Sequence, residues 1–293
     1  MFNNSSQPRI LFVTPEVTFV PHNLEHTAQY FVNRKGGFAD YLSGLIFDLY
    51  RLGGDVHVVQ PDYRQIFTSV SQEILYKNAK KIPAKRVHLT EDRAFFYSSY
   101  PDSNSKWENT KISIAFQREV INRIIPEVQP DLLHCHDWMT GLIPAMAKII
   151  GIPCLFSVQN PDTATTFLSH IEDMGIDAAV FWQHLFYDRY PITYDEIRES
   201  NPANFLLSGI LAANFVNVTT SVFLARNGEY QNPLAESPFW EVLARKKIAG
   251  CAAVNSDLAK TEQYLEIYRR LLQRFFPGLN YEKLKRKNSR LIK

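Results

Sequence analysis

The chain has 293 residues, of which 32 are basic and 30 acidic, so its formal net charge is only +2. A charge so close to zero excludes a long-range field that would draw the chain to nucleic acid or to anionic lipid. The length is sufficient to bury a large hydrophobic core. No run approaches the roughly 18 apolar residues that span a bilayer, and the polar first eight residues lack a signal-peptide pattern, so we expect a cytoplasmic protein.

The three cysteines, Cys135, Cys154 and Cys251, are widely spaced along the chain. They form no pair with the spacing of a metal site, and three are too few for a disulfide framework. We therefore expect small buried side chains in a reducing compartment, with no metal site and no bound cofactor.

A strand, a helix and a second strand are predicted within the first sixty residues. Residues 10–13 form a short apolar run, and apolar side chains recur at three- and four-residue spacing over 38–49. Gly53 and Gly54 end that helix, and residues 56–59 form the next apolar run. A βαβ unit of this kind implies parallel strands joined by a right-handed crossover.

The remaining pattern continues this alternation and predicts one doubly wound, Rossmann-like α/β domain with a mostly parallel sheet, closed by a C-terminal helix. Short strands near residues 86–89 and 95–97 are expected at a sheet edge, and residues 163–200 are aromatic and mostly helical or irregular. Further strands are predicted at 132–135, 153–158 and 215–218, and helices at 112–128, 140–150, 204–213 and 260–276. We expect one domain over residues 1–258, followed by an amphipathic helix and a basic tail over 259–293.

Polar and aromatic side chains follow several of the predicted strands. Ligands of doubly wound sheets bind outside the carboxyl ends of the strands. The residues expected there are Glu16, the loop Arg34-Lys35-Gly36-Gly37, His136-Asp137-Trp138 and Gln159-Asn160.

The loop Arg34-Lys35-Gly36-Gly37 offers two cations and a glycine turn before a helix, a combination that favours an anion. Its spacing is neither GxGxxG nor a Walker sequence. A structural turn with incidental basic residues is an equally open interpretation.

His136 and Trp138 each have two interpretations, and Asp137 has one. His136 can donate a hydrogen bond to a substrate or be satisfied within the fold, and Trp138 can stack on a sugar or pack in the core. Asp137 is expected to cap the following helix, because aspartate is a favoured N-cap residue. A histidine beside an aspartate is no catalytic triad, and no GxSxG motif is present. Asn160 and Asn204 are more typical of caps and turns than of ligand-binding amides.

Taken together, these residues resemble the bacterial glycogen synthase and plant starch synthase family of glycosyltransferases. That family has a strand ending in glutamate, a Lys-x-Gly-Gly-Leu-Ala-Asp loop and an ordered series of further motifs. The matching segments here are residues 10–16, Arg34 to Asp40, residues 52–63, Pro130 to Trp138, residues 156–160 and residues 204–214.

The resemblance implies transfer of glucose from ADP-glucose, or UDP-glucose in some members, to the end of an α-1,4-glucan with retention of configuration. Members use two Rossmann-like domains facing across a cleft. The resemblance places Arg34, Gly36 and Gly37 at the donor phosphates and His136 at the transferred glucose. It also makes Asp137 catalytic and makes the rest of these positions substrate-binding, namely Glu16, Lys35, Asp40, Trp138, Gln159, Asn160 and Asn204.

The sequence also departs from the family pattern. The first lysine of the loop is Arg34, the histidine before Asn160 is Gln159, and a family lysine is Leu207. Too few residues follow the last match for a second Rossmann-like half, so we expect the donor half to be missing, with a homo-oligomer or a donor-domain partner chain in its place.

Three functions remain open. The first is a glucan synthase domain that is incomplete by itself. The second is a non-catalytic homologue that binds a glucan or regulates a synthase. The third is an unrelated nucleotide-binding protein.

Overall fold

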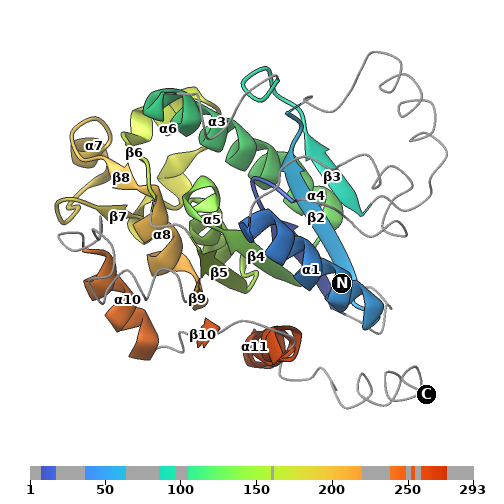
Figure 1. Ribbon diagram of the computed structural model, residues 1–293. Helices are drawn as coiled ribbons and strands as arrows, with labels where there is room; N and C mark the ends of the chain where they lie inside the picture. Colours follow the sequence, from blue (N-terminus) through green and yellow to red (C-terminus); the bar gives the residue numbers. More distant parts are fainter. Residues whose placement is uncertain are drawn as a thin grey trace, which may run out of the picture.

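The computed structural model describes residues 8–17, 37–63, 86–96, 105–159, 162–219, 238–248, 252–254 and 259–275. Its centre is a seven-stranded sheet in the order β10-β9-β5-β4-β1-β2-β3 (Figure 1). Every strand pair in this sheet is parallel. The strands are β1 (Arg9–Val13), β2 (Asp55–Pro61), β3 (Val87–Thr90), β4 (Leu132–His136), β5 (Cys154–Val158), β9 (Phe215–Thr219) and β10 (Ala252–Val254).

A second, antiparallel sheet of three short strands has the order β6-β8-β7. Figure 1 shows it beside α7, at the left of the view and away from α1 and β2. Its strands are β6 (Thr165–Thr166), β7 (Phe186–Tyr187) and β8 (Ala203–Asn204). The sequence predicts a mostly helical or irregular segment over residues 163–200, without a sheet. Strands of two residues are too short to show an alternating pattern of apolar and polar side chains, so this sheet could not be predicted from the sequence.

Helices connect the strands and cover both faces of the large sheet. The longest helical segment runs without a break through α3, the π-helical turn η2 and α4, whereas the other helices are separate. They are α1 (Gly37–Arg51), α3 (Lys106–Glu119), η2 (Val120–Ile124), α4 (Ile125–Val128), η3 (Trp138–Thr140), α5 (Ile143–Ile150), α6 (Leu168–Asp173), η4 (Ala178–Val180), η5 (Trp182–His184), α7 (Tyr194–Ile197), α8 (Phe205–Ala212), α10 (Phe239–Ile248) and α11 (Ala259–Phe275).

Strands β1, β4 and β5, at the centre of the large sheet, are buried on both faces, as near-continuous apolar runs require. Alternate residues belong to two separate cores. Leu133 packs in the core beneath α3, α5, α8 and α10, whereas Leu132 packs in the core beneath α1 and α11. We refer to these as the α5 face and the α11 face.

The sequence analysis predicted the main alternation of strands and helices correctly. Rossmann-like α/β architecture, the parallel strands and the closing C-terminal helix are confirmed. The edge position of the strand near residue 88 is also confirmed, since β3 ends the sheet. The prediction of a strand at 95–97 is wrong for residues 95 and 96, the two that the structure describes. Residues 93–96 form a turn in which the Phe95 amide donates a hydrogen bond to the Asp92 carbonyl. Helix α10 was not anticipated.

Two glycines allow helix α8 to lie close against the large sheet. A β-carbon on Gly209 would lie 2.4 Å from the ring of Phe156, and one on Gly141 would lie 2.0 Å from the carbonyl oxygen of Phe205. Neither distance is possible for a side chain, so glycine is required at both positions. The start of α8 is thereby held against the turn that follows β4.

The α11 face contains a buried polar network. The ring of His134 bonds the hydroxyl of Tyr268 through Nδ1 at 2.7 Å and that of Ser157 through Nε2 at 2.8 Å. Further bonds join Asn217 to Tyr264 and Ser157, and Tyr41 to Tyr264. We call these six residues the tyrosine–histidine network. It fastens the last described helix to strands β4, β5 and β9.

None of the helices in the described part of the chain is both long enough and apolar enough to cross a membrane. Cys135 and Cys154 are buried and unbridged on neighbouring strands, in agreement with the expectation for these two. Cys251 lies outside the described residues.

Candidate functional site

Three of the predicted site segments follow strands that are neighbours in the sheet. Glu16 follows β1, His136 ends β4 and Gln159 follows β5, and these strands lie in the order β5-β4-β1. Because the strands are parallel, all three segments meet at one carboxyl edge. The sequence predicted this convergence, and the strand order confirms it.

His136 is fully buried on the α11 face of the sheet. Its ring lies 4.1 Å, centroid to centroid, from that of His134 and is stacked 6.1 Å from that of Phe12. Burial lowers the pKa of His136 to about 3. The pKa of His134 is also lowered well below its ordinary value, first by burial and then by the neighbouring His136. Both rings are therefore neutral at physiological pH.

Asp137 occupies an unusual backbone conformation, with φ of 56° and ψ of 179°. This region is almost exclusive to glycine, and holding another residue there costs about 1–3 kcal/mol. The Asp137 carboxylate accepts a hydrogen bond of 2.7 Å from the amide of Gln159. The carboxylate therefore ties the end of β4 to the end of β5.

The expectation that Asp137 caps the next helix is only half right. Asp137 does precede the short helix η3, but its side chain makes no capping hydrogen bond there. The carboxylate instead points across to Gln159, which satisfies an amide at the end of the neighbouring strand. This contact cannot be predicted from the sequence, because it depends on the register between β4 and β5.

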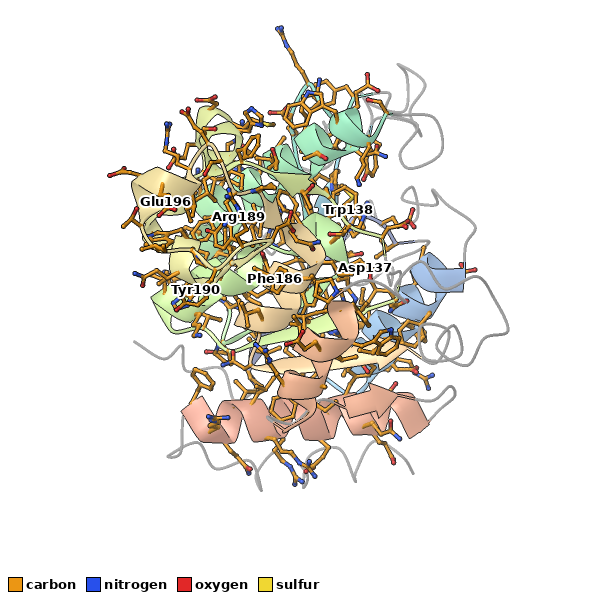
Figure 2. All side chains as sticks on the ribbon, turned by 90° about the vertical axis from the view of Figure 1, so that its left-hand side faces the viewer. Asp137, Trp138, Phe186, Arg189, Tyr190 and Glu196 are labelled. Atoms are coloured by element: carbon orange, nitrogen blue, oxygen red, sulfur yellow. The ribbon has the colours of Figure 1, made fainter. Side chains whose placement is uncertain are left out.

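Trp138 is mostly buried, with 7% of its surface exposed, and its ring lies 6.4 Å from that of Phe205. In this arrangement Trp138 packs in the core. Figure 2 shows Asp137 and Trp138 near the middle of the molecule, with Arg189, Tyr190 and Glu196 to one side.

Asn204 caps helix α8, as the sequence favoured. Its side-chain oxygen accepts hydrogen bonds from the Leu207 amide at 3.0 Å and from the Thr163 hydroxyl at 2.8 Å. Thr163 also accepts a hydrogen bond from the Leu206 amide. The sequence analysis did not identify Thr163, because its contact with Asn204 joins residues 41 positions apart in the chain and leaves no local pattern.

The loop before α1 is described only from Gly37, the first residue of that helix. Asp40 is exposed in the first turn of α1, and Glu16 is half-buried beyond β1. The predicted site residues Arg34, Lys35, Gly36 and Asn160 lie outside the described residues.

The described part of the chain contains no group of three or more histidine, cysteine, aspartate or glutamate side chains arranged to hold a metal ion. The polar groups described at the carboxyl edge are backbone amides, the buried ring of His136 and the carboxylates Glu16, Asp40 and Asp137.

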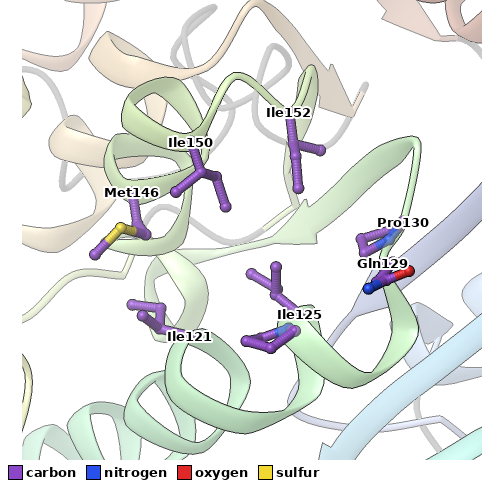
Figure 3. Close-up of a pocket in the computed structure, with 8 residues that line it drawn as sticks. Ile121, Ile125, Gln129, Pro130, Met146, Ile150 and Ile152 are labelled. Carbon is purple, nitrogen blue, oxygen red and sulfur yellow. The ribbon is translucent and has the colours of Figure 1, made fainter. Parts of the chain in front are cut away.

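An apolar pocket of about 580 Å³ lies elsewhere on the α5 face (Figure 3). Its walls include Ile121 and Ile125 on one side and Met146 and Ile150 on the other. Pro130 also lines it and lies just before β4, which places the pocket at the amino end of the strands. It is thus at the opposite end of the sheet from the candidate site.

Fold and site together define a class: an α/β domain whose parallel strands present polar groups at one carboxyl edge, as nucleotide-sugar transferases of the GT-B type do. The family model for the starch synthase catalytic domain matches residues 9–227. The chain therefore belongs to the starch synthase catalytic domain family.

Relatives of known name are distant and longer. A glycogen synthase of Geotalea daltonii is 24% identical over 250 residues, which cover 73% of this chain and 46% of that protein. Glycogen synthase 2 of Geobacter sulfurreducens is 24% identical over 249 residues, covering 73% and 47%. The chain thus spans about half the length of the curated relatives it matches.

A solved structure shows the same fold. The catalytic domain of starch synthase IV from Arabidopsis thaliana, bound to ADP and acarbose, aligns with a TM-score of 0.56 and 16% identity. The alignment covers 85% of this chain and 51% of that one. It confirms the Rossmann-like architecture expected from the sequence.

Proposed function

We propose that this chain is the acceptor-side half of an α-glucan synthase, which transfers glucose from ADP-glucose to an α-1,4-glucan with retention of configuration. The observation that carries the proposal is the meeting of Glu16, His136-Asp137 and Gln159 at one carboxyl edge, within a chain that matches the starch synthase catalytic domain over residues 9–227. A cytoplasmic location is part of the proposal.

In the proposed site, the loop from Arg34 to Gly37 binds the donor phosphates. Backbone amides at the start of α1 and the cations Arg34 and Lys35 favour an anion there. Arg34 replaces a point charge by a planar guanidinium that binds two phosphate oxygens at once. Asp40, exposed in the first turn of α1, is proposed to bind the substrate beside this loop.

The acceptor glucan lies along the ends of β4 and β5 in this proposal. Asp137, held by Gln159, is the carboxylate nearest the reacting sugar, and Glu16, Trp138, Asn160 and Asn204 complete the surroundings. His136 acts at the transferred glucose only if the turn after β4 moves to expose it, because its ring is fully buried here.

Stabilisation of a departing nucleotide diphosphate requires charges on both sides of the cleft. Catalysis is therefore proposed to need further donor-binding residues on the opposite side of the cleft, from a donor-domain partner chain, another copy or a further part of the same protein. Residues 1–258 form the proposed Rossmann-like domain, and 259–293 form its closing helix and basic tail.

A non-catalytic, glucan-binding or regulatory role is the second candidate. The complete burial of His136 favours it, as does glutamine at position 159, where the family motif has histidine.

The two candidates are separated by one pair of measurements on the purified chain. The first is incorporation of labelled glucose from ADP-glucose, or from UDP-glucose, into glycogen. The second is co-sedimentation with glycogen. Because the proposed synthase needs a donor-binding half, incorporation is measured with the chain alone and with the separately produced donor-binding half of a glycogen synthase added. Incorporation in either case that is lost in Arg34→Ala supports a synthase. Co-sedimentation without incorporation in both cases supports the binding role. If neither is seen, both candidates are wrong.

A further inference from the structure

We propose that Trp107, Phe167 and His170 form an outer subsite on which the acceptor glucan stacks a sugar ring. This inference rests on the proposed function and extends it to residues outside the candidate site. We call these three residues the Trp107 ledge.

The ledge lies beyond the carboxyl edge of the sheet. The helix that begins with α3 ends at Val128, whose carbonyl accepts a hydrogen bond from Arg9 at the start of β1. Its far end therefore points past the carboxyl edge. Ser113, in the middle of α3, bonds the Met139 carbonyl in the turn after β4. Trp107 precedes Ser113 by six residues, so it stands about 9 Å farther out along the helix.

The ledge is rigid. Ser105 and Glu108 form a reciprocal capping box at the start of α3, which fixes the helical turn that carries Trp107. The ring of His170 packs against Trp107 with centroids 5.3 Å apart and is oriented by a 2.9 Å hydrogen bond with Thr166. A rigid platform costs little conformational entropy on binding.

Trp107 is nevertheless 45% exposed. Phe167 also packs against His170, and the centroids of their rings are 5.7 Å apart. A large aromatic ring that is held in place and left half in water suits a ligand with an apolar face and a polar rim. The pyranose rings of an α-glucan have this character, since their C–H faces are apolar and their hydroxyl groups lie at the edge.

Backbone pairing connects the ledge to the candidate site. Thr166, which orients His170, lies in β6, and its neighbour Thr165 pairs with Asn204 in β8. Asn204 caps helix α8 beside the turn after β4. A glucan that leaves the site over Asn204 therefore meets the ledge on the same wall of the molecule.

The test compares oligosaccharides of different length on the purified chain. Binding of maltose and of maltoheptaose is measured by calorimetry for the wild type, Trp107→Ala, Trp107→Phe and the control Tyr190→Ala. Tyr190 is a suitable control because it is 92% exposed and belongs to the loop between β7 and α7, not to the ledge. Unchanged far-UV circular dichroism shows that each variant is folded.

We expect Trp107→Ala to raise the Kd for maltoheptaose roughly tenfold, because the apolar contact with one sugar ring is lost. Trp107→Phe is expected to lie between the wild type and Trp107→Ala. The affinity for maltose, and the behaviour of Tyr190→Ala, should not change. Equal maltoheptaose affinities in the wild type and Trp107→Ala would overturn the ledge alone. A wild type that binds neither sugar would overturn the ledge together with the proposed function.

Discussion

The two faces of the large sheet are covered in different ways. The α5 face is an apolar core in which side chains from α3, α5, α8 and α10 pack on strand residues such as Phe156. The α11 face is smaller and contains the tyrosine–histidine network among its apolar side chains. Apolar packing adjusts to many side-chain arrangements, whereas a buried network requires each donor to meet its own acceptor. The α11 face therefore specifies one position for its helix, and the α5 face supplies more of the burial.

The largest effect is expected on the α5 face. Phe156→Ala removes a fully buried ring that lies against Gly209 and should lower the free energy of unfolding by about 3–5 kcal/mol. Urea unfolding followed by circular dichroism measures this loss. A loss below about 1 kcal/mol would mean that the face collapses around the cavity and is packed less closely than described.

On the α11 face, Tyr268→Phe leaves His134 Nδ1 without its partner while the ring volume is kept. We expect a loss of about 1–3 kcal/mol, the cost of a buried polar group left unsatisfied. The matched control is Tyr190→Phe at an exposed position, which should change stability by less than about 0.5 kcal/mol. Equal effects of the two substitutions would show that the network adds nothing beyond apolar contact.

The two faces should also differ in their response to acid. His134 and His136 have lowered pKa values when folded, and they take up protons near pH 6.5 when unfolded. The contribution of the two neutral rings to the stability of the fold is therefore complete above about pH 6.5, and it is lost as the pH falls below that value. As the pH falls from 6.5 to 5, each histidine should lower the free energy of unfolding by about 1.4 kcal/mol per pH unit. Urea unfolding between pH 7.5 and 5 measures the slope.

The slope has an internal control. Burial raises the pKa of Asp55, but hydrogen bonds from His57 and Arg9 outweigh burial and lower it to about 2. Asp55 therefore loses its stabilising effect only below about pH 4. His136→Asn should make the slope shallower from pH 6.5 down to about pH 3, where the folded His136 ring takes up its own proton, and should keep the additional loss from Asp55 below pH 4. An unchanged slope would contradict the assignment to the histidines.

The smallest effect concerns Asp137, which lies between β4 and η3. Asp137→Gly relieves backbone strain of about 1–3 kcal/mol but removes the hydrogen bond to Gln159, worth about 1.5–3 kcal/mol. These changes nearly cancel. Asp137→Ala loses the hydrogen bond and keeps the strain, so it should be less stable than Asp137→Gly by the strain energy, about 1–3 kcal/mol. Urea unfolding of the pair decides this, and the reverse order would show that the backbone there is not strained.

The sequence predicted the large sheet well because its strands are apolar runs and its helices have a clear period. Gly53 and Gly54 even marked the end of α1 correctly. The two-residue strands β6, β7 and β8 left no periodic signal, and neither did helix α10. Local pattern alone does not record pairing between short segments far apart in the chain.

Within the candidate site, the sequence identified which segments meet but not what their side chains do. The convergence of Glu16, His136 and Gln159 follows from strand order, which the βαβ pattern implies. The burial of His136 beneath Phe12 and the contact of Asp137 with Gln159 depend on register and rotamer. The roles of the site residues stay predictions that the binding experiments address.

Helix α11 has a consequence for how the chain is made. His134 and Tyr268 are 134 residues apart in sequence, and Tyr41 and Tyr264 are 223 apart. During synthesis, the strands of the α11 face and helix α1 therefore leave the ribosome long before α11, the second helix that covers this face, exists. Until residues 261–272 emerge, the part of this face that α11 covers is open to other chains, so aggregation of the nascent protein is expected there.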